Sequence, residues 1–372
     1  MRRLRTLHLN TERTWRGGEQ QTLYLATGIE GRGHLARVLC QPESEMSRRA
    51  SRAGLEVVEI PMRGEVDPVA AWRIARHIRR NRVDILHMHT SHAHGLGVLV
   101  SMLTRAPGRV VHRRVDFSIF RNRLKLSRFK YRRGVDRYVA ISLAVKAQMV
   151  EDGVPAHCIS VVPSGIDAAR LDNLHASRDT MRAALGLALD VPVVGCVAHL
   201  AWHKGQEFLV RAVPRLLERV PAARIIIVGE GERRSLLESE IQRLDVGGQV
   251  MLTGFREDVP ALMQAFDVLA MPSVMEGLNT TLLDAQCLGI PVVASRVGGI
   301  PEAVKEGEGG VLVQPRNPVV LADALADLLG DRERRMELGR LGSVRVRKEF
   351  SVDRMVEGNL AVYHELLGEK RR

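Results

Sequence analysis

The chain has 372 residues, of which 45% are hydrophobic and 26% charged, and its formal net charge is +12 at pH 7. This length exceeds one ordinary domain and predicts two domains of roughly 150–200 residues each. No apolar run approaches the roughly 18 residues that span a bilayer, and aromatic residues, at 4%, are too few for the stacking platforms of single-stranded nucleic-acid binders.

The positive charge suggests an anionic partner, although arginine-rich composition alone could also produce it. The chain contains no zinc-finger, RRM or basic-zipper pattern. A membrane surface or an anionic acceptor is therefore favoured over nucleic acid. Residues 1–9 carry charge but no apolar h-region, so we expect a first strand there and not a signal peptide. Scattered cysteines without metal spacing predict reduced thiols in the cytoplasm: Cys40, Cys158, Cys196 and Cys287.

Strands and helices alternate throughout the chain, which is typical of a parallel sheet wrapped by helices. The first strand is predicted at residues 5–9, followed by a glycine turn at 14–20 and a helix at 21–30. The adjacent Gly17 and Gly18 would let the backbone come close to a ligand. Further strands are predicted at 35–39, 57–60 and 83–89, and a helix at 70–80.

A group of histidines follows the strand at 83–89. His87 and His89 lie two residues apart, so they share one face of that strand, and we place His92 and His94 in the following loop. A metal site is one interpretation. Contact with a sugar or an acceptor by one or two of these side chains is favoured over it, and loop packing is the remaining alternative.

A strand at residues 109–116 runs into a basic segment, residues 117–137, in which arginine and lysine alternate with aromatic and aliphatic side chains. Cations attract anionic headgroups while rings enter the lipid boundary, so this segment favours association with an anionic membrane surface. A solvated helix that packs its leucines and phenylalanines inward is the alternative. Strands at 135–142 and 159–167 close the first domain, and the polar residues 168–180 are predicted to form a linker.

The second domain is predicted to open with a strand, a loop and a helix start at residues 192–205. Lys204 would place an ammonium at that helix start, which suits a diphosphate because charge-assisted contacts to phosphate are strong. The next strand, in residues 224–232, is followed by Gly229 and Gly231. Arg234 stands where a dinucleotide fingerprint would need its third glycine. Another strand and turn are predicted at 250–256.

The central motif of the second domain follows an apolar strand at residues 268–271. The chain turns at Glu276 and Gly277 and enters a helix near Leu278, with Asp284 about two turns inside. A helix N-terminus offers free N–H groups and a positive dipole end to an anion. Carboxylates on either side of that anion could accept hydrogen bonds from sugar hydroxyls, so the motif suits a nucleotide sugar. A strand and a Gly-Gly-Ile-Pro-Glu loop (290–302) and terminal helices (350–367) complete the chain.

Taken together, these motifs resemble those of the retaining glycosyltransferases of family 4, which have the GT-B fold. The resemblance covers residues 1 to about 367. It includes two acids separated by seven residues at Glu276 and Asp284, the Lys-Gly pair at Lys204, and the Gly-Gly-x-Pro-Glu loop that ends at Glu302, which we interpret as a helix N-terminal acid.

The resemblance implies roles for individual residues. Glu276 would contact the transferred sugar, Asp284 the ribose and Lys204 the donor diphosphate. A histidine that approaches the donor sugar is assigned to His112, with Arg114 as the alternative. Together with these, the donor-binding residues implied by the family pattern are Gly17, Gly18, His199, Gly229, Phe255, Arg256, Gly277, Leu278, Asn279 and Thr280.

The chain departs from the family pattern in three places. Asp284 replaces a glutamate and is one methylene shorter. His199 replaces an arginine that binds phosphate, so His203 or backbone groups would have to assist Lys204. Ser164 replaces an asparagine in the Val-x-Pro-Asn-Gly motif.

We therefore predict an α/β protein with the GT-B fold, two Rossmann-like domains that face each other across a cleft. The predicted parts are an acceptor-binding domain (1–170), a nucleotide-sugar-binding domain (180–350) and a C-terminal helix that returns to the first domain (351–372). The predicted function is retaining, metal-independent transfer of a sugar from a nucleotide sugar to a glycan or lipid-linked acceptor, in envelope polysaccharide or lipopolysaccharide synthesis. No cofactor is expected, and the protein should be cytoplasmic and peripheral on the membrane. The alternatives are a GT-B nucleotide-sugar epimerase and a non-catalytic membrane-surface protein.

Overall fold

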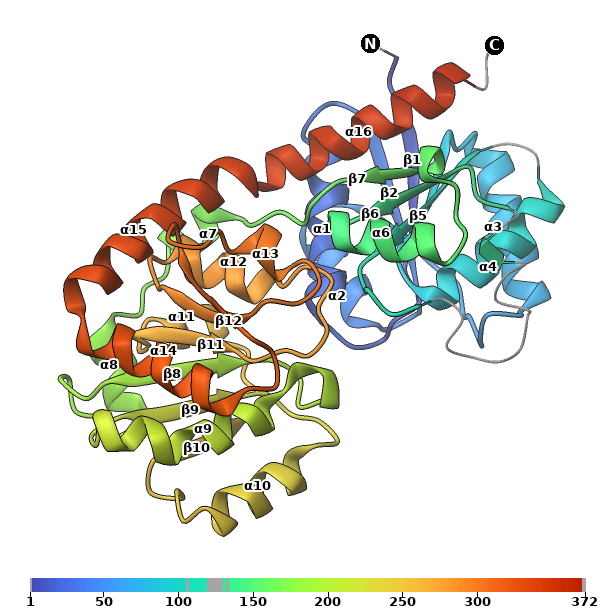
Figure 1. The fold of residues 1–372 in the computed structure, drawn as a ribbon. Coiled ribbons are helices and arrows are strands. Elements are labelled where there is room, and N and C mark those ends of the chain that lie inside the picture. The colour runs from blue at the N-terminus through green and yellow to red at the C-terminus, as the bar shows by residue number, and fades with distance from the viewer. Residues whose placement is uncertain (1, 105–106, 119–129, 132–133, 370–372) are drawn as a thin grey trace. The chain divides into compact units, whose positions relative to one another are not determined.

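The computed structural model describes residues 2–104, 107–118, 130–131 and 134–369, and it divides into two compact units (Figure 1). One unit comprises Met1–Gly165 together with Val352–Arg372, and the other comprises Ile166–Ser351. Residues 119–129 and 132–133 of the basic segment lie outside the described residues. None of the described helices combines the length and the apolar content of a membrane span.

The first unit is built on a seven-stranded parallel sheet with the order β3-β2-β1-β4-β5-β6-β7. The chain starts in the middle of the sheet at β1, moves outward to β3, and returns to the other side of β1 at β4. The strands are β1 (Arg5–Leu9), β2 (Leu35–Cys40), β3 (Glu56–Glu59), β4 (Ile85–Met88), β5 (Gly108–Arg113), β6 (Arg137–Ala140) and β7 (Ile159–Val161). The point between β1 and β4, where the winding direction changes, is where open α/β sheets bind ligands.

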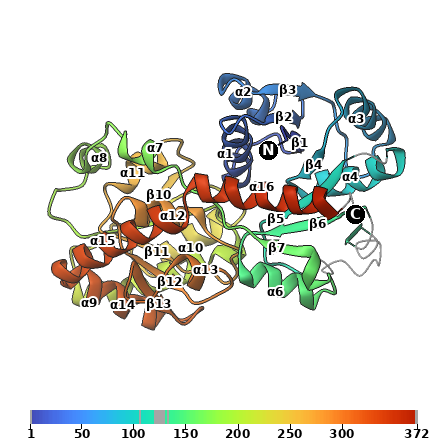
Figure 2. The same ribbon diagram turned by 90° about the horizontal axis from the view of Figure 1, so that it is seen from above.

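Helices cover both faces of this sheet. On one face α1 (Gly17–Glu30) packs against α2 (Glu45–Arg52) and the C-terminal helix α16 (Val352–Glu369), and α16 also lies over β5 and β6 (Figure 2). The other face carries α3 (Pro68–Asn81) and α4 (Ser91–Leu103). The remaining elements are α6 (Leu143–Glu151) and η1 (Ala156–Cys158). Buried residues of α1 and α16 belong to one hydrophobic cluster with the strands, so burial of their apolar stripes fixes α16 in this unit.

The second unit repeats this plan with a six-stranded parallel sheet of order β10-β9-β8-β11-β12-β13. Its strands are β8 (Val193–Val197), β9 (Arg224–Val228), β10 (Val250–Gly254), β11 (Val268–Met271), β12 (Val292–Ser295) and β13 (Gly310–Val313). β8 and β11 are fully buried apolar runs, as central parallel strands require. The winding direction changes between these two strands.

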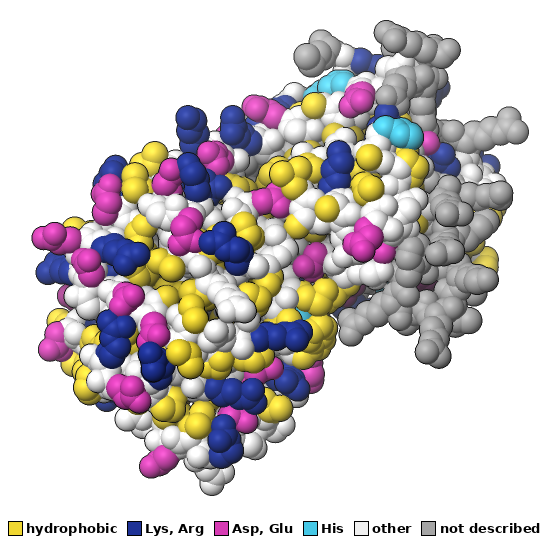
Figure 3. All heavy atoms as spheres, viewed as in Figure 1, with side chains coloured by type: hydrophobic (Ala, Val, Ile, Leu, Met, Phe, Trp, Pro, Cys, Tyr) yellow, Lys and Arg dark blue, Asp and Glu magenta, His cyan; other side chains and the backbone are white. Residues whose placement is uncertain are grey.

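The helices of the second unit also form two layers. α9 (Gln206–Arg219), α10 (Arg234–Arg243) and α14 (Pro318–Gly330) pack together on one face. α11 (Val259–Met263), α12 (Thr280–Cys287) and α15 (Arg332–Glu349) pack on the other. The short elements are α7 (Ala168–Asp172), α8 (Arg178–Ala184), η2 (Trp202–Lys204) and α13 (Ile300–Ala303). Basic and acidic side chains are interspersed over the surface of this unit (Figure 3), as in the ion pairs Arg215–Asp323 and Arg219–Asp327 between α9 and α14.

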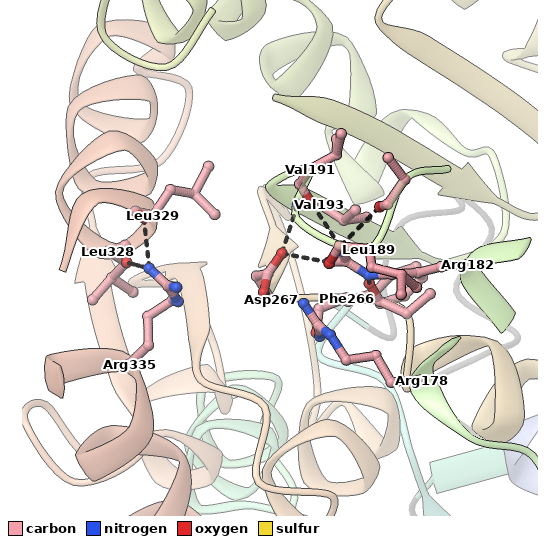
Figure 4. Close-up of polar contacts among 12 residues, drawn as sticks. Arg178, Arg182, Leu189, Val191, Val193, Phe266, Asp267, Leu328, Leu329 and Arg335 are labelled. Atoms are coloured by element: carbon pink, nitrogen blue, oxygen red, sulfur yellow. Dashed lines mark hydrogen bonds and ion pairs between the residues drawn. The ribbon is translucent and has the colours of Figure 1, made fainter. Parts of the chain in front are cut away.

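A buried arginine ties α8 to the sheet of the second unit. Arg182 is fully buried and its Nη2 lies 2.7 Å from Oδ2 of Asp267, the residue before β11. It also donates hydrogen bonds to the carbonyl groups of Leu189 and Val191, while Asp267 accepts the N–H of Val193 (Figure 4). The charge is thus both paired and surrounded by acceptors, which a buried guanidinium needs.

Several local predictions differ from the structure. The helix predicted at 21–30 begins at Gly17, because Glu19 at its third position accepts the N–H of Arg16 and so stabilises the first turn. The predicted linker, 168–180, contains α7 and the start of α8, whose caps are Asp167 and Ser177. The four cysteines are free, and Cys158 is half-buried while the other three are buried.

Two site predictions also need correction. His92 and His94 lie in α4 and not in a loop, because the Thr90 hydroxyl caps that helix by accepting the N–H of Ala93. The helix of the central motif begins at Thr280 with Asn279 as its cap, so Asp284 lies little more than one turn inside it.

Candidate active site

Two residues predicted to bind the donor meet at the switch point of the second sheet. Lys204 comes from the loop after β8, and Glu276 from the loop after the neighbouring strand β11. Nζ of Lys204 lies 2.6 Å from Oε2 of Glu276, and the two side chains are 16% and 11% exposed. Little water reaches this ion pair, so it is held more strongly than a surface pair.

Asn279 connects this ion pair to the start of α12. Its Nδ2 donates to Oε2 of Glu276 at 3.0 Å, while its Oδ1 accepts the N–H groups of Thr281 (2.8 Å) and Leu282 (3.3 Å). In the part of the chain that the structure describes, the N–H groups of Leu278, Asn279 and Thr280 donate no hydrogen bond. The residues predicted to meet phosphate thus present free donors beside a lysine.

The two loops are also joined through their backbones. The N–H groups of Val274 and Met275 donate to the carbonyl of His203 at 2.8 and 3.3 Å. Gly205 has φ +67°, and a Cβ there would lie 2.1 Å from the carbonyl oxygen of Pro272. Only glycine fits this conformation and this approach, so the Lys-Gly pair places Lys204 against the Glu276 loop.

Two histidines, His199 and His203, precede Lys204 in the segment after β8. His199 is half-exposed, and its Nε2 lies 3.4 Å from Oε2 of Glu232. Burial lowers the pKa of His203, and the nearby Lys204 ammonium lowers it further. His203 is therefore neutral near pH 7, and its backbone carbonyl holds the Glu276 loop.

Asp284 lies in a half-buried position of α12. Burial raises its pKa from 3.8 to about 7; the nearby Asp167 carboxylate adds to this, and Arg170 opposes it. Among the described residues, no donor forms a hydrogen bond with its carboxyl group. An acid that is partly protonated and lacks donors is ready to accept hydroxyl groups from a ligand.

The remaining donor-binding predictions fall on two neighbouring turns. Gly229 has φ +141°, and a Cβ there would lie 2.1 Å from the carbonyl oxygen of Ala198, so the glycine is required by the close approach of these backbones. Its N–H donates to the carbonyl of Gly254 at the end of β10. Phe255, next in the chain, is 66% exposed. Arg256 forms an ion pair with Asp258.

In the first unit, Gly17 and Gly18 form the first turn of α1, and Arg114 lies beside them. A Cβ on Gly18 would lie 3.5 Å from Cδ of Arg114. The Nε and Nη1 atoms of Arg114 are shielded from solvent and have no hydrogen-bond partner among the described residues. Of the two residues proposed to approach the donor sugar, Arg114 is therefore the one next to the glycine turn, whereas His112 is buried in β5.

Arg114 begins a directed chain of hydrogen bonds through buried histidines. A guanidinium can only donate, so its contact with Nδ1 of His89 (3.2 Å) places the His89 proton on Nε2. Nε2 of His89 then donates to Nδ1 of His8 (3.0 Å), and Nε2 of His8 donates to the Thr6 hydroxyl, which donates to the Leu35 carbonyl. Burial lowers the pKa of His8 to about 3 and that of His89 well below its usual value, so both are neutral.

His87 and His112 extend this cluster. His112 stacks on His87 with ring centroids 5.3 Å apart, and Nδ1 of His87 lies 2.5 Å from the Tyr363 hydroxyl of α16. Ring nitrogens of His8, His87 and His89 lie within 4.8 Å of one another, as metal ligands could. A metal bound at Nε2 of His89 would require a proton on Nδ1, where Arg114 donates. The hydrogen-bond directions thus favour a neutral histidine chain over a metal centre.

His8 was not predicted to belong to this cluster. Its register partner in β4 is His87. His8 could have been found from the sequence, because each of the two strands that flank the predicted switch point carries a histidine at a corresponding position. Neither Arg114 as the start of a hydrogen-bond chain nor the Tyr363 contact could be predicted, because both depend on distant parts of the chain coming together.

Comparison with known proteins identifies the family. Residues 177–343 match the family described as glycosyl transferases group 1, and residues 15–170 match glycosyltransferase family 4. A GDP-mannose-dependent alpha-(1-6)-phosphatidylinositol monomannoside mannosyltransferase of Mycolicibacterium smegmatis is 31% identical over 344 residues, which cover 88% of this chain and 89% of that protein. A D-inositol 3-phosphate glycosyltransferase of Nocardia farcinica is 36% identical over 248 residues, 63% of this chain and 53% of that protein.

The solved structures establish the fold. The crystal structure of Anabaena HepE in complex with UDP and glucose has a TM-score of 0.85 and 21% identity, and the match covers 97% of this chain and 100% of HepE. Together with the two parallel sheets, this likeness confirms the predicted GT-B fold. The chain belongs to glycosyltransferase family 4, the retaining group 1 glycosyltransferases, and it is a glycosyltransferase.

Proposed function

We propose that this enzyme transfers a hexose or related sugar from a nucleotide sugar held by the second unit to a glycan or lipid-linked acceptor in cell-envelope synthesis. The observation that carries the proposal is the Lys204–Glu276 ion pair beside the free N–H groups at the start of α12. One cationic group, one acid and a helix start are the elements needed to bind a diphosphate and the sugar attached to it.

The proposed roles follow from these contacts. Lys204 and the N–H groups of Leu278–Thr280 bind the diphosphate and stabilise the charge that develops on it as it leaves. Glu276, oriented by Asn279, accepts hydrogen bonds from hydroxyls of the transferred sugar. Asp284 binds the ribose, and the backbone around Phe255 and Arg256 meets the base.

We further propose that Gly17, Gly18 and Arg114 of the first unit contact a substrate. Arg114 replaces His112 in this proposal because its shielded guanidinium lies at the glycine turn. Its free Nε and Nη1 donors suit an anionic or hydroxyl-rich ligand.

Retention of configuration is explained by attack on the front face of the sugar. The bond between the anomeric carbon and the diphosphate oxygen breaks as a bond from the acceptor oxygen forms on the same face. The acceptor proton passes to the leaving diphosphate, so no protein nucleophile is needed. Water would compete with the acceptor, and closure of the enzyme on its substrates would exclude it.

The relatives suggest substrates to test first. The mycobacterial relative is named as dependent on GDP-mannose and acts on a phosphatidylinositol monomannoside, and the HepE structure contains UDP and glucose. A thermal-shift screen of UDP-, GDP- and ADP-sugars identifies the donor, because a ligand that binds only the folded state raises its apparent stability.

The site is tested by measuring donor binding and sugar transfer in the variants Glu276→Gln and Lys204→Ala. Both variants should lose both activities. Removing a charge-assisted contact made in the transition state should reduce kcat/KM at least about 100-fold. Lys305 and Glu308 form an exposed pair of the same residue types at 2.5 Å, so Lys305→Ala and Glu308→Gln are matched controls. Wild-type kinetics in Glu276→Gln would refute the assignment.

Two further properties belong to this proposal. Because Lys204 and α12 supply the positive charge for the diphosphate, transfer should proceed without a metal ion, and EDTA should leave the rate unchanged. The basic segment, residues 117–137, should bind anionic membranes. Within it, Lys130 is held by Glu65 at 2.9 Å, so glutamine substitutions at Arg121, Arg123 and Lys125 test the lipid contact, measured by vesicle sedimentation.

A further inference from the structure

The buried hydrogen-bond chain that starts at Arg114 ends at the backbone of the first sheet. Nε2 of His8 donates to the Thr6 hydroxyl at 3.0 Å, and that hydroxyl donates to the Leu35 carbonyl at 3.2 Å. A carbonyl oxygen can only accept a hydrogen bond, and the guanidinium at the other end can only donate. The two ends therefore impose the same direction, and each hydroxyl and imidazole between them has one proton position.

His8 is the residue of this chain that fixes the tautomer of His89. Its Nδ1 lies 3.0 Å from Nε2 of His89, and because the His8 proton is on Nε2, this nitrogen can only accept. The His89 proton is thus held on Nε2, which leaves the lone pair of Nδ1 for Arg114 at 3.2 Å. In the other tautomer Nδ1 would carry a proton, and two donors would face each other.

The chain lies in the core, where polar groups are not required for stability. Thr6, His8 and His89 are 1%, 0% and 5% exposed. Burial lowers the pKa of His8 to about 3 and that of His89 well below its usual value, so His89 stays an acceptor for Arg114 between pH 5 and pH 8. Well-packed apolar side chains in place of buried polar groups are often neutral in stability. A polar chain at this place therefore points to a role in the site.

Arg114 depends on its contact with His89. In the described part of the chain this contact is its one hydrogen bond, and its Nε and Nη1 atoms are shielded without a partner. Burial lowers the pKa of Arg114 to about 10, which the Glu19 carboxylate opposes, so the guanidinium stays charged near neutral pH. An arginine side chain has several rotatable bonds, so a single directional hydrogen bond decides its orientation when no other partner competes.

The ring of His89 is held on its faces as well. Its centroid lies 4.1 Å from that of His87 and 5.3 Å from that of His8. The Tyr363 hydroxyl of α16 lies 2.5 Å from Nδ1 of His87 and fixes that ring in turn. Because the position of the His89 ring is restricted by its neighbours, its tautomer decides what Arg114 meets.

We propose that His8 is a positioning residue for sugar transfer, because it fixes the tautomer of His89 and thereby the orientation of the Arg114 guanidinium. The inference rests on the proposed function, in which Arg114 contacts a substrate, and it extends that function to a residue behind the site. His8 is fully buried and two hydrogen bonds away from Arg114, so it acts on the substrate only through this arginine.

The first measurement is the tautomer of His89, by NMR of protein with 15N-labelled histidine, with the signals assigned by their loss in His89→Gln. In the wild type the proton should be on Nε2 from pH 5 to pH 8. His8→Leu removes the acceptor and should add a population with the proton on Nδ1. His8→Asn keeps an acceptor oxygen near the place of Nδ1 and should retain the wild-type tautomer. A wild-type His89 with its proton on Nδ1, or an unchanged tautomer in His8→Leu, would overturn the proposal.

The second measurement is donor hydrolysis, which needs no acceptor, with the donor that the screen of UDP-, GDP- and ADP-sugars selects. His8→Leu should lower kcat/KM about 3- to 10-fold, the effect of one hydrogen bond, and His8→Asn should stay within about twofold of wild type. In the Arg114→Gln background His8→Leu should have no further effect, because its action passes through that arginine. An equal loss in both backgrounds would show a merely structural role and would overturn the proposal.

His94→Leu is the matched control. His94 is as deeply buried in the same unit, but its Nε2 lies 3.0 Å from the carbonyl oxygen of Lys130, outside this chain. Its substitution should leave kcat/KM within about twofold of wild type and the tautomer of His89 unchanged. A loss in His94→Leu as large as that in His8→Leu would show that any buried histidine of this unit has the same effect, against the proposal.

The outcome is separable from that of the proposed function. If no nucleotide sugar is bound, or if Arg114→Gln is as active as wild type, the proposed function fails at that point. The tautomer of His89 in the wild type and in the His8 variants then still decides whether His8 acts on Arg114. If Arg114→Gln lowers the rate and His8→Leu does not, only the positioning proposal fails.

Discussion

Asp284 provides a quantitative test of the candidate site, through the substitution Asp284→Asn. Burial raises the pKa of this carboxyl from 3.8 to about 7, so the folded protein binds the proton more tightly than the unfolded chain does. Stability contributed by the protonated acid is therefore present at low pH and is lost as the pH rises from about 4 to about 7. An asparagine stays neutral throughout and removes this loss.

The magnitude follows from the pKa difference. About three pKa units correspond to about 4 kcal/mol at pH 8. The side chain is half-buried, and water that reaches it screens the charge, so we expect about half of this value, ~2 kcal/mol. Roughly two-thirds of the change falls between pH 5 and pH 8. For a unit of this size the Tm of Asp284→Asn should therefore rise relative to wild type by about 3–6 °C across that interval.

The assay is thermal unfolding of both proteins at half-unit steps between pH 5 and pH 8. Asp323→Asn is the control, because the hydrogen bond from Arg215 lowers the pKa of Asp323, so this carboxyl titrates below the assay range and the effect of the substitution on Tm should not change between pH 5 and pH 8. This prediction would be refuted if the difference in Tm between wild type and Asp284→Asn did not change with pH, or if wild type were the more stable protein at pH 8. Either result would show that this carboxyl is well solvated.

The same titration should appear in nucleotide binding. A carboxylate accepts hydrogen bonds from ribose hydroxyls better than a protonated acid does. The affinity of the wild-type protein for its nucleoside diphosphate should increase from pH 6 to pH 8. The affinity of Asp284→Asn should be lower than that of wild type at pH 8, and it should not show the increase that the titration of Asp284 causes. Calorimetry at both pH values measures it. If the affinities of the two proteins had the same pH dependence, Asp284 would not bind the ribose.

Three other predictions follow from buried contacts. Arg114→Gln should lower kcat at least about 10-fold. His89→Leu should lower kcat less and raise KM for the donor, because His89 only positions Arg114. If both variants were as stable and as active as wild type, this prediction would be contradicted. Arg182→Met should lower the free energy of unfolding in chemical denaturation by about 3–5 kcal/mol, because Asp267 would be left without its buried partner. Arg178 pairs with the same aspartate from a more exposed position, so Arg178→Gln should lower it by at most about 1 kcal/mol. EDTA should not change the transfer rate, and a loss restored by a divalent cation would show that Lys204 does not suffice for the diphosphate.

The alternation of apolar strands and amphipathic helices was enough to predict the two parallel sheets. The first strand was predicted at residues 5–9 and observed at Arg5–Leu9, because a short apolar run between charged and polar residues has one favourable conformation in a parallel sheet. Errors occur at helix starts. Gly17 and Gly18 predicted a turn, but the capping contact of Glu19 outweighs their low helix propensity.

Contacts between distant segments limited what the sequence could show at the site. That Lys204 and Glu276 belong to one site followed from the family motifs, but their 2.6 Å ion pair and the two functions of Asn279 required the folded loops. The choice between His112 and Arg114 could not be made from spacing, since the two residues lie only two positions apart. In the structure His112 lies within β5, whereas Arg114 follows that strand and lies at the glycine turn, which is why the proposal takes Arg114.

Two of the three departures from the family pattern, His199 and Asp284, have a common physical consequence. With His199 in place of arginine, the proposed diphosphate site would depend on Lys204, and that ammonium is shared with Glu276. Asp284, with its raised pKa, brings less negative charge near the donor at neutral pH than an ionised glutamate would. The proposed donor site thus combines one cation fewer with an acid that is less ionised. The substitution His199→Arg restores the arginine. Above pH 7, where Asp284 is ionised, it should therefore tighten donor binding more when Asp284 is present than in the Asp284→Asn variant. A double-mutant cycle of donor affinity at pH 8 measures that coupling. Additive effects of the two substitutions would show that the two positions act independently on the donor.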